Sequence, residues 1–323
     1  MWAYRVAGTM VLEEVQVASP SVADLTPGEV LLRTLAGGIC GSDYPAFAGA
    51  KGLVRDADGV LRGRVGAPLH EIVGVVEGSR DDTVRVGDHV VGWAGSSDGL
   101  AERIVTRAAR VHRYRAGTDP VSAVLLQPLA CVLEALDRVE VSDRDVAVLG
   151  LGPIGLLFSH LARSRGARSI VGIDPVDRGH RGAALGLDRQ MVATGSTWAE
   201  TAGGPAYPAP QVVVEAVGHQ TSTVDDAIKA VAIGGTVLCF GIPDQDVYPI
   251  DMERIMRKNL TVVGGVTRQH AQSLAGAEDY LHQHPGLVDL LLTHRFPRVG
   301  AQAAFEAAAR PSADRLKVVI DLA

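Results

Sequence analysis

The sequence is poor in cysteine and lacks a long apolar run. Its three cysteines, Cys40, Cys131 and Cys239, are odd in number and far apart, so no disulfide framework is expected. The longest uncharged window, residues 146–162, is too short and too broken by glycine and proline to span a bilayer. Acids near the N-terminus stand where a signal peptide needs a basic and an apolar region. These absences predict a soluble protein of the reducing cytoplasm.

Basic runs are also missing, and the 323 residues carry a net charge of −6. This balance argues against nucleic-acid binding. Hydrophobic residues make up 47% and charged residues 21%, which is typical of a globular chain with a sizeable core. The length predicts two domains or one large α/β domain.

Short strands are expected in the first hundred or so residues. The β-rich runs at 29–36, 71–78, 88–95 and 101–111 are separated by glycine, aspartate and proline. Residues 51–66 are polar and rich in glycine, which predicts a long surface loop.

From about residue 145, apolar strands alternate with helical stretches. The expected strands are 145–150, 169–174, 211–218 and 235–241, and the helical stretches include 153–166 and 223–235. Because these strands are apolar on both faces, they predict a doubly wound parallel sheet, and the fold class is α/β.

A G-x-G-x-x-G pattern, GLGPIG, follows the first of these strands and opens a helix. Glycines let the backbone approach a pyrophosphate, and the helix N-terminus offers free N–H groups. A glycine-rich turn in a buried strand–helix unit is the alternative. The residues of the predicted dinucleotide turn are Gly150, Gly152, Pro153, Ile154 and Gly155.

Asp174 ends the next strand, 19 residues after Gly155. At this spacing a carboxylate accepts hydrogen bonds from the adenosine ribose. It also repels a 2′-phosphate, so NAD is favoured over NADP. Arg178 and Arg181 follow closely and would accommodate that phosphate, and Arg178 is counted with the cofactor-binding residues.

A metal site is indicated by GGICGSD, residues 37–43, and by His70-Glu71 after Pro68 and Leu69. A cysteine, a histidine and a glutamate at junctions of turns and strands form a plausible zinc set. A structural role for the histidine is the alternative.

Six motifs occur in one order: GGICGSD, APLHEIVGVVEG, VRVGDHVVG, DGLAERIV, LLQPLACVLEAL and VAVLGLGPIG. With LLTHRFP at 291–297, they make the chain resemble the zinc-dependent medium-chain dehydrogenase/reductase family, closest in pattern to the glucose and polyol dehydrogenases. The resemblance covers nearly the whole chain. It implies a GroES-like β-rich catalytic domain, residues 1–125 and 269–323, and a Rossmann domain, residues 126–268.

The same resemblance assigns roles to individual residues. Cys40 and His70 would be ligands of a catalytic zinc, and Glu71 a ligand or an alternating ligand. Ser42 would take the proton of the substrate. Asp43 would accept a hydrogen bond from His70 and fix its tautomer.

Several positions depart from the family pattern. Gln127 stands at the remaining ligand position, where a neutral amide oxygen binds zinc weakly, and Cys131 is a rival ligand. Pro45 replaces a histidine that ends a proton relay, and Leu69 replaces a glycine. No cysteine lies between Cys40 and Cys131, so one catalytic zinc and no structural zinc are expected.

Residues 95–99, GSSDG, match the G-x-S-x-G pattern of a hydrolase. A nucleophile elbow needs a helix after that serine, and the sequence that follows predicts a strand, so this function is rejected.

The substrate is expected to be a polar alcohol or carbonyl compound. Aromatic residues make up only 4%, and residues 44–66 carry polar side chains that suit a sugar, polyol or cyclitol. An ordinary surface loop is an equally good explanation. The polar residues of this loop are Tyr44, Lys51, Arg55, Asp56 and Asp58.

Two rival functions and the assembly remain open. A zinc-free NADPH-dependent quinone or enone reductase shares the architecture, and a non-catalytic dinucleotide-binding protein would tolerate Gln127 and Pro45. By resemblance, residues 247–266 lie where family members pair sheet edges, so a homodimer or homotetramer is expected.

Overall fold

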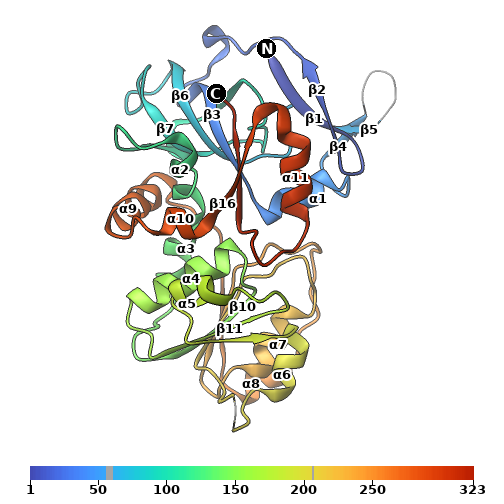
Figure 1. Ribbon diagram of the computed structural model, residues 1–323, viewed down its shortest axis with the longest axis vertical. Coiled ribbons are helices and arrows are strands. Elements are labelled where there is room, and N and C mark those ends of the chain that lie inside the picture. The colour runs from blue at the N-terminus through green and yellow to red at the C-terminus, as the bar shows by residue number, and fades with distance from the viewer. Residues whose placement is uncertain (56–60, 206) are drawn as a thin grey trace. The chain divides into compact units, whose positions relative to one another are not determined.

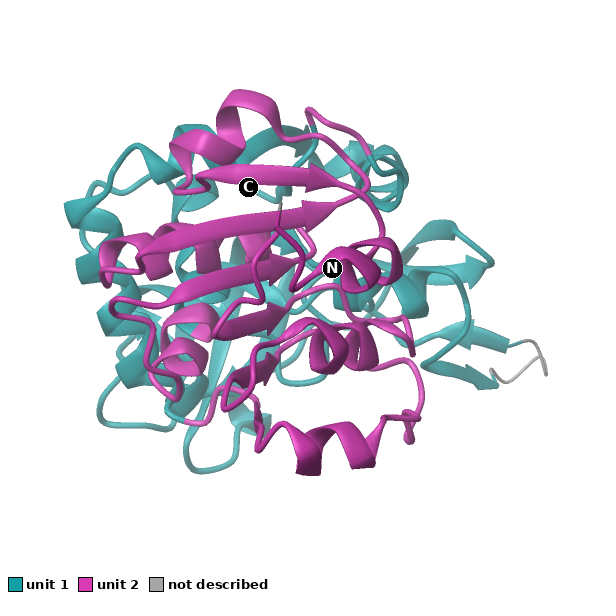
Figure 2. Ribbon diagram, turned by 90° about the horizontal axis from the view of Figure 1, so that it is seen from below, with its two compact units in different colours: residues 1–130, 269–311, 315–323 teal, residues 131–268, 312–314 magenta. Residues whose placement is uncertain are grey.

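The computed structural model describes residues 1–55, 61–205 and 207–323, which divide into two compact units (Figure 2). Unit 1 comprises Met1–Ala130, Gln269–Pro311 and Arg315–Ala323. Unit 2 comprises Cys131–Arg268 and Ser312–Asp314. A mainly antiparallel sheet organises unit 1 and a parallel sheet organises unit 2, so the predicted α/β class is confirmed.

The large sheet of unit 1 is centred on β3, which pairs with β6, β8 and β17 (Figure 1). Its order is β16-β17-β3-β6-β7-β9, with β8 also on β3. The strands are β1 (Trp2–Gly8), β2 (Val11–Gln16), β3 (Glu29–Ile39), β4 (Leu53–Arg55), β5 (Leu61–Gly63), β6 (Glu71–Ser79), β7 (His89–Trp93), β8 (Arg103–Arg107), β9 (Val111–Arg113), β16 (Leu292–Pro297) and β17 (Lys317–Asp321).

Short helices connect these strands. They are α1 (Tyr44–Phe47), α2 (Pro120–Ala123), α9 (His270–Gln283), α10 (Leu287–Leu291) and α11 (Ala301–Ala309), with 3-10 turns at η1 (Val22–Asp24), η2 (Gly41–Asp43), η3 (Ala108–Arg110) and η4 (Arg298–Gly300). Helix α3 (Leu126–Leu136) runs across the boundary of the two units. Phe47, Leu69 and Phe305 belong to one apolar cluster in which β17 and α11 also take part.

Three sequence expectations differ from the structure. The predicted loop at 51–66 contains two short strands, β4 and β5, which pair antiparallel. Strand β5 packs on β1 so closely that a Cβ at Gly63 would lie 3.0 Å from Val6 Cβ. Asp56 and Asp58 lie outside the described residues. The run 101–111 is divided into β8 and β9 by the turn η3. The helix expected at 223–235 ends at Ala230, because the next residue, Val231, is extended.

Unit 2 contains a six-stranded parallel sheet in the order β12-β11-β10-β13-β14-β15. Helices α4 and α5 cover one face and α6 and α7 the other (Figure 1). The strands are β10 (Asp145–Leu149), β11 (Ser169–Asp174), β12 (Arg189–Val192), β13 (Val212–Glu215), β14 (Thr236–Cys239) and β15 (Thr261–Gly264). The helices are α4 (Pro153–Ser164), α5 (Gly179–Ala184), α6 (Gly195–Thr201), α7 (Thr223–Ala230) and α8 (Met252–Arg257).

The strand order of unit 2 reverses direction beside β10, which pairs with β11 on one side and β13 on the other. In open α/β sheets, ligands bind beyond the carboxyl ends of the strands at such a switch point. The predicted glycine turn follows β10 directly, so it lies at this position. No helix among the described residues has the length and hydropathy needed to cross a bilayer.

Candidate metal centre and dinucleotide site

The side chains of Cys40, His70 and Glu71 are brought together in unit 1. Their Sγ, imidazole nitrogen and carboxylate oxygen lie within 4.8 Å of one another, and no other such group of three is found among the described residues. Cys40 follows β3 and Glu71 begins β6. The antiparallel register pairs Gly38 with Glu71, so the end of β3 lies beside the beginning of β6.

Two glycines on β3 make room for this centre. A Cβ at Gly37 would lie 2.4 Å from Leu69 Cδ2, so the fully buried Leu69 needs a glycine opposite it. A Cβ at Gly38 would lie 2.2 Å from Glu71 Oε2 and 2.9 Å from Lys317 Cε. Gly37 and Gly38 of GGICGSD are therefore required by packing against Leu69, Glu71 and Lys317.

Asp43 connects the backbone of Cys40 with the side chain of His70. It lies in η2 and is 2% exposed. Its Oδ2 accepts a hydrogen bond from Cys40 N at 2.9 Å, and its Oδ1 lies 2.7 Å from His70 Nδ1. A carboxylate at Nδ1 holds the proton on that nitrogen and leaves Nε2 as the metal-binding atom.

The environment of His70 favours its charged form. Burial opposes protonation, but the carboxylate of Asp43 and the sulfur of Cys40 raise the pKa of His70 well above its usual value. The raised pKa favours the protonated imidazole in the metal-free protein. A metal ion must displace that proton, so binding weakens as the pH falls.

Lys317, on β17, forms a buried ion pair with Glu71. Its Nζ lies 2.5 Å from Glu71 Oε2, with side chains 3% and 1% exposed. The same Nζ donates to the carbonyl of Ile39 at 3.1 Å. Burial opposes the charge of Lys317, but Glu71 and Cys40 raise its pKa above the usual value. Sequence reasoning missed this residue, although a single lysine in the apolar run LKVVI, residues 316–320, was a signal.

The donor set fits zinc. A thiol, an imidazole and a carboxylate are the ligand types that zinc prefers, and three protein ligands leave a position for substrate. Glu71 Oε1 is buried and accepts no hydrogen bond from the described residues, so a cation would satisfy it. Because Oε2 pairs with Lys317, a metal ion at Glu71 would compete with an ammonium group for the carboxylate.

Gln127, Ser42 and Pro45, which the sequence also placed at the site, lie in three different helical elements of unit 1. Gln127 is 2% exposed in the first turn of α3. It follows Val124, whose Cγ1 lies 2.5 Å from the Cβ position of Gly38. Ser42 is half-buried in η2, and Pro45 lies in α1. Whether Gln127 binds metal stays a prediction.

We expect Asp43→Asn to weaken zinc binding about 10- to 100-fold. The neutral amide does not hold the proton on His70 Nδ1 as the charged carboxylate does. Competition with a chromophoric chelator measures the affinity. Asp81→Asn is the control, since Asp81 accepts hydrogen bonds only within an exposed turn, and it should leave zinc affinity unchanged. Equal affinities of the Asp43 variant and the wild type would contradict the role of Asp43.

The glycine turn of unit 2 has the geometry of a dinucleotide site. Gly150 has a φ of +91°, and a Cβ at Gly155 would lie 1.8 Å from Gly150 O, so both positions need glycine. Gly152 caps α4, and Pro153 occupies the first turn, followed by Ile154. The turn is a cradle that a side chain would fill, and it fits a pyrophosphate.

Asp174 and Arg178 flank this turn in different ways. Asp174 Oδ2 accepts a hydrogen bond from Leu151 N at 2.7 Å, which fixes the carboxylate beside the glycine turn. Arg178 is 7% exposed and donates to the carbonyl of Ser312 at 2.7 Å. Burial lowers its pKa, although Asp174 acts in the opposite direction. Arg181 lies 3.9 Å from Asp314. Both arginines therefore contact the segment Ser312–Asp314.

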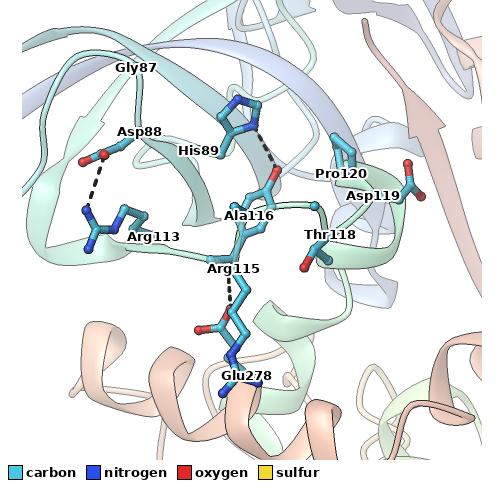
Figure 3. Close-up of a pocket in the computed structure, with 12 residues that line it drawn as sticks. Gly87, Asp88, His89, Arg113, Arg115, Ala116, Thr118, Asp119, Pro120 and Glu278 are labelled. Carbon is cyan, nitrogen blue, oxygen red and sulfur yellow. Dashed lines mark hydrogen bonds and ion pairs between the residues drawn. The ribbon is translucent and has the colours of Figure 1, made fainter.

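A cavity in unit 1 carries none of the predicted site residues. It has a volume of about 880 Å³ and lies in unit 1 between the beginning of β7 and Glu278 of α9 (Figure 3). Its charged groups are already paired: Arg113 lies 3.7 Å from Asp88, and Arg115 N donates to Glu278 at 2.6 Å. This cavity is therefore separate from the metal chemistry. The turn 95–99 is likewise followed by β8 and not by a helix, which fits the rejection of a hydrolase.

The fold and the metal centre together define a two-unit oxidoreductase with a dinucleotide-type sheet. Residues 26–118 match the alcohol dehydrogenase GroES-like domain, and residues 118–322 match the glucose dehydrogenase C-terminus. The chain therefore belongs to the zinc-type medium-chain dehydrogenase/reductase family, as the sequence motifs predicted, and it is an NAD(P)-dependent enzyme of the alcohol and polyol dehydrogenase type.

Individual relatives agree with this assignment. The chain is 29% identical over 358 residues to L-arabinitol 4-dehydrogenase of Talaromyces emersonii, covering 96% of this chain and 88% of the relative. It is 29% identical over 322 residues to D-altritol 5-dehydrogenase of Agrobacterium fabrum, covering 87% and 89%. The structure of an alcohol dehydrogenase from Thermus sp. ATN1 has the same fold, with a TM-score of 0.85, 22% identity and full coverage of both chains.

Proposed function

We propose that the chain interconverts a secondary alcohol and a ketone of a polyol, sugar or cyclitol, with NAD as the cofactor and one zinc ion at Cys40, His70 and Glu71. The observation that carries this proposal is the group of three ligand side chains within 4.8 Å of one another. Relatives named for L-arabinitol and D-altritol support a polyhydroxylated substrate.

The residues of the centre perform separate tasks. When bound, the zinc supplies a Lewis acid for the substrate oxygen and the nicotinamide exchanges the hydride. Cys40 and His70 bind the metal, and Asp43 holds His70 in the binding tautomer. Glu71 balances the charge of Lys317, so the metal and Lys317 compete for its carboxylate, and Gln127 is proposed as a weak further ligand.

Ser42 is proposed to accept the proton of the substrate hydroxyl. It lies two residues after Cys40, in the 3-10 turn that Asp43 anchors. The next step of proton transfer cannot use Pro45, which has no titratable group. We therefore propose that water takes the proton from Ser42.

The preference for NAD rests on the side chains near Asp174. Asp174 is fixed beside the glycine turn, where its charge opposes a 2′-phosphate. Arg178 is occupied by the carbonyl of Ser312, and Arg181 has Asp314 as a neighbour. These contacts direct both arginines toward the segment Ser312–Asp314, which supports the preference for NAD.

The polar segment near Cys40 supports a hydroxylated substrate. Tyr44 is 44% exposed, and Lys51 and Arg55 are exposed as well. A zinc-free enone reductase is not favoured, because it does not need the ligand set, and a non-catalytic binding protein is not favoured by the named dehydrogenase relatives. The three cysteines are free, which supports a reducing compartment such as the cytoplasm.

The test is an activity screen of polyols, sugars and cyclitols with NAD and with NADP, with zinc quantified on the same sample. We expect turnover of a polyol or sugar with NAD and about one zinc per chain. Removal of zinc by a chelator should abolish the activity, and added zinc should restore it. Full activity of a metal-free sample would overturn the proposal.

A dimer through the edge of the unit 2 sheet is proposed as the assembly. Strand β15 is an edge strand, with Val262 43% exposed, and Met256 of the neighbouring α8 is 71% exposed. An apolar edge of this kind favours pairing with a second copy.

Val262→Lys should convert the dimer to a monomer, because each copy would place a cation in the paired edge. Light scattering coupled to size exclusion measures the mass. Val299→Lys, at a 74% exposed position of unit 1, is the control and should leave the mass unchanged. An unchanged mass for both variants contradicts the proposed edge.

A further inference from the structure

Glu215 is a buried carboxylate at the carboxyl end of β13, and it organises the turn that follows. It is 1% exposed. Its Oε1 accepts hydrogen bonds from Val217 N at 2.9 Å, Gly218 N at 3.0 Å and Thr223 Oγ1 at 3.0 Å. Its Oε2 accepts one from Gly241 N at 3.2 Å, so it also joins β13 to the end of β14. A carboxylate with four donors fixes the backbone of this turn.

The turn after Glu215 packs directly against the glycine turn. Leu149 pairs with Glu215 in the parallel register, and Ala216 N donates to Leu149 O at 2.8 Å. A Cβ at Gly150 would lie 2.8 Å from Val217 Cγ2 and 3.0 Å from Val217 N. The two turns thus form the two sides of the switch point at which dinucleotides bind.

His219 has two unusual features in this turn. Its φ is +53°, a left-handed conformation that a histidine rarely adopts. Its Nδ1 is buried and has no hydrogen-bond partner among the described residues. The backbone is held there because His219 N donates to Ile242 O at 2.9 Å. Strained backbone and an unsatisfied buried atom at one residue are typical of a functional site.

We propose that His219 binds the dinucleotide through Nδ1, with an oxygen of its ribose–phosphate backbone as partner, and that Glu215 is the positioning residue for this contact. The inference rests on the proposed dehydrogenase function, which supplies the ligand. Glu215 holds the turn, the turn holds His219 in the left-handed conformation, and the ligand satisfies the buried nitrogen.

The decisive variant is His219→Gly. Glycine adopts a positive φ without strain, so the melting temperature of the variant should be unchanged or higher. Loss of one hydrogen bond should raise the dissociation constant for NAD+ about tenfold. Titration calorimetry with NAD+ measures the affinity without any turnover. A merely structural histidine would not combine retained stability with weakened binding.

Matched controls separate strain from ligand binding. Asp143 has the same φ of +53° but precedes β10, at the amino ends of the strands, whereas His219 follows the carboxyl end of β13. Asp143→Gly should therefore keep the affinity for NAD+ within twofold. His219→Asn tolerates the left-handed backbone and retains a polar group, so its affinity should lie between those of the glycine variant and the wild type.

A second pair of variants tests Glu215. Glu215→Gln replaces an acceptor with a donor, and we expect about a tenfold weaker binding of NAD+ together with a lower melting temperature. Asp145→Asn is the control, because Asp145 also accepts several hydrogen bonds but lies at the amino end of β10. It should lower stability and leave the affinity unchanged.

The outcomes distinguish this inference from the proposed function. Wild-type protein that binds neither NAD+ nor NADP+ overturns both. Wild-type binding with an unchanged dissociation constant in His219→Gly overturns the role of His219 alone. Equal losses of affinity in Glu215→Gln and Asp145→Asn overturn the positioning role of Glu215.

Discussion

Replacement of Cys40 with serine is expected to remove the bound zinc and to lower dehydrogenase activity by at least about a thousandfold, because Lewis-acid stabilisation supplies several kcal/mol. A hydroxyl remains protonated and binds zinc poorly compared with a thiolate. Metal analysis and turnover of the substrate found in the screen give the two readouts.

Cys239→Ala is the matched control for this prediction. Cys239 is also a free, partly buried cysteine, but it ends β14 in unit 2. Burial raises its pKa to about 11, so it remains a thiol. The control should retain zinc and activity. If the Cys40 variant kept a full equivalent of zinc, Cys40 would not be a ligand.

Replacement of Lys317 with methionine is expected to lower the free energy of unfolding of the metal-free protein by about 3–5 kcal/mol. The substitution leaves the buried carboxylate of Glu71 without its ion-pair partner, which is the costly case for a buried ion pair. The midpoint of denaturant unfolding, with fluorescence as the probe, measures the change. Zinc should raise the unfolding midpoint of this variant more than that of the wild type, since it supplies the missing positive charge.

Two controls support the interpretation. The double variant Lys317→Met/Glu71→Gln removes both charges and should recover most of the lost stability. Arg257→Met removes a partner of Glu253 in an exposed pair whose side chains are 77% and 71% exposed, so its effect should stay below about 1 kcal/mol. Equal destabilisation by the single and double variants would show that packing, not charge, is responsible.

Local patterns were sufficient to predict the architecture. The strands of unit 2 are short apolar runs, and the glycine turn follows one of them, so neighbouring residues carry the information. The antiparallel pairing of β4 with β5 was not predictable in this way, because its support comes from packing on β1. The limits of β8 and β9 depend similarly on their separate partners, β3 and β7.

Only those residues of the candidate metal centre that lie within sequence motifs were predictable. Cys40 and His70 stand in recognisable stretches, whereas Lys317 lies 246 residues after Glu71 and is joined to it by strand pairing. His219 gave no sequence signal at all. Its left-handed backbone results from hydrogen bonds to β13 and β14, which a single sequence does not reveal.

The position of β17 in the sheet has a consequence for synthesis of the protein. Strand β3, from the first forty residues, has β17, from the last seven, as a direct neighbour. The segment 131–268 lies between them in the chain and has its own sheet. On the ribosome, this middle segment can fold while unit 1 still lacks β17. The candidate ligands Cys40, His70 and Glu71 are therefore synthesised long before Lys317, and a chain that has not yet reached β17 lacks the ion-pair partner of Glu71.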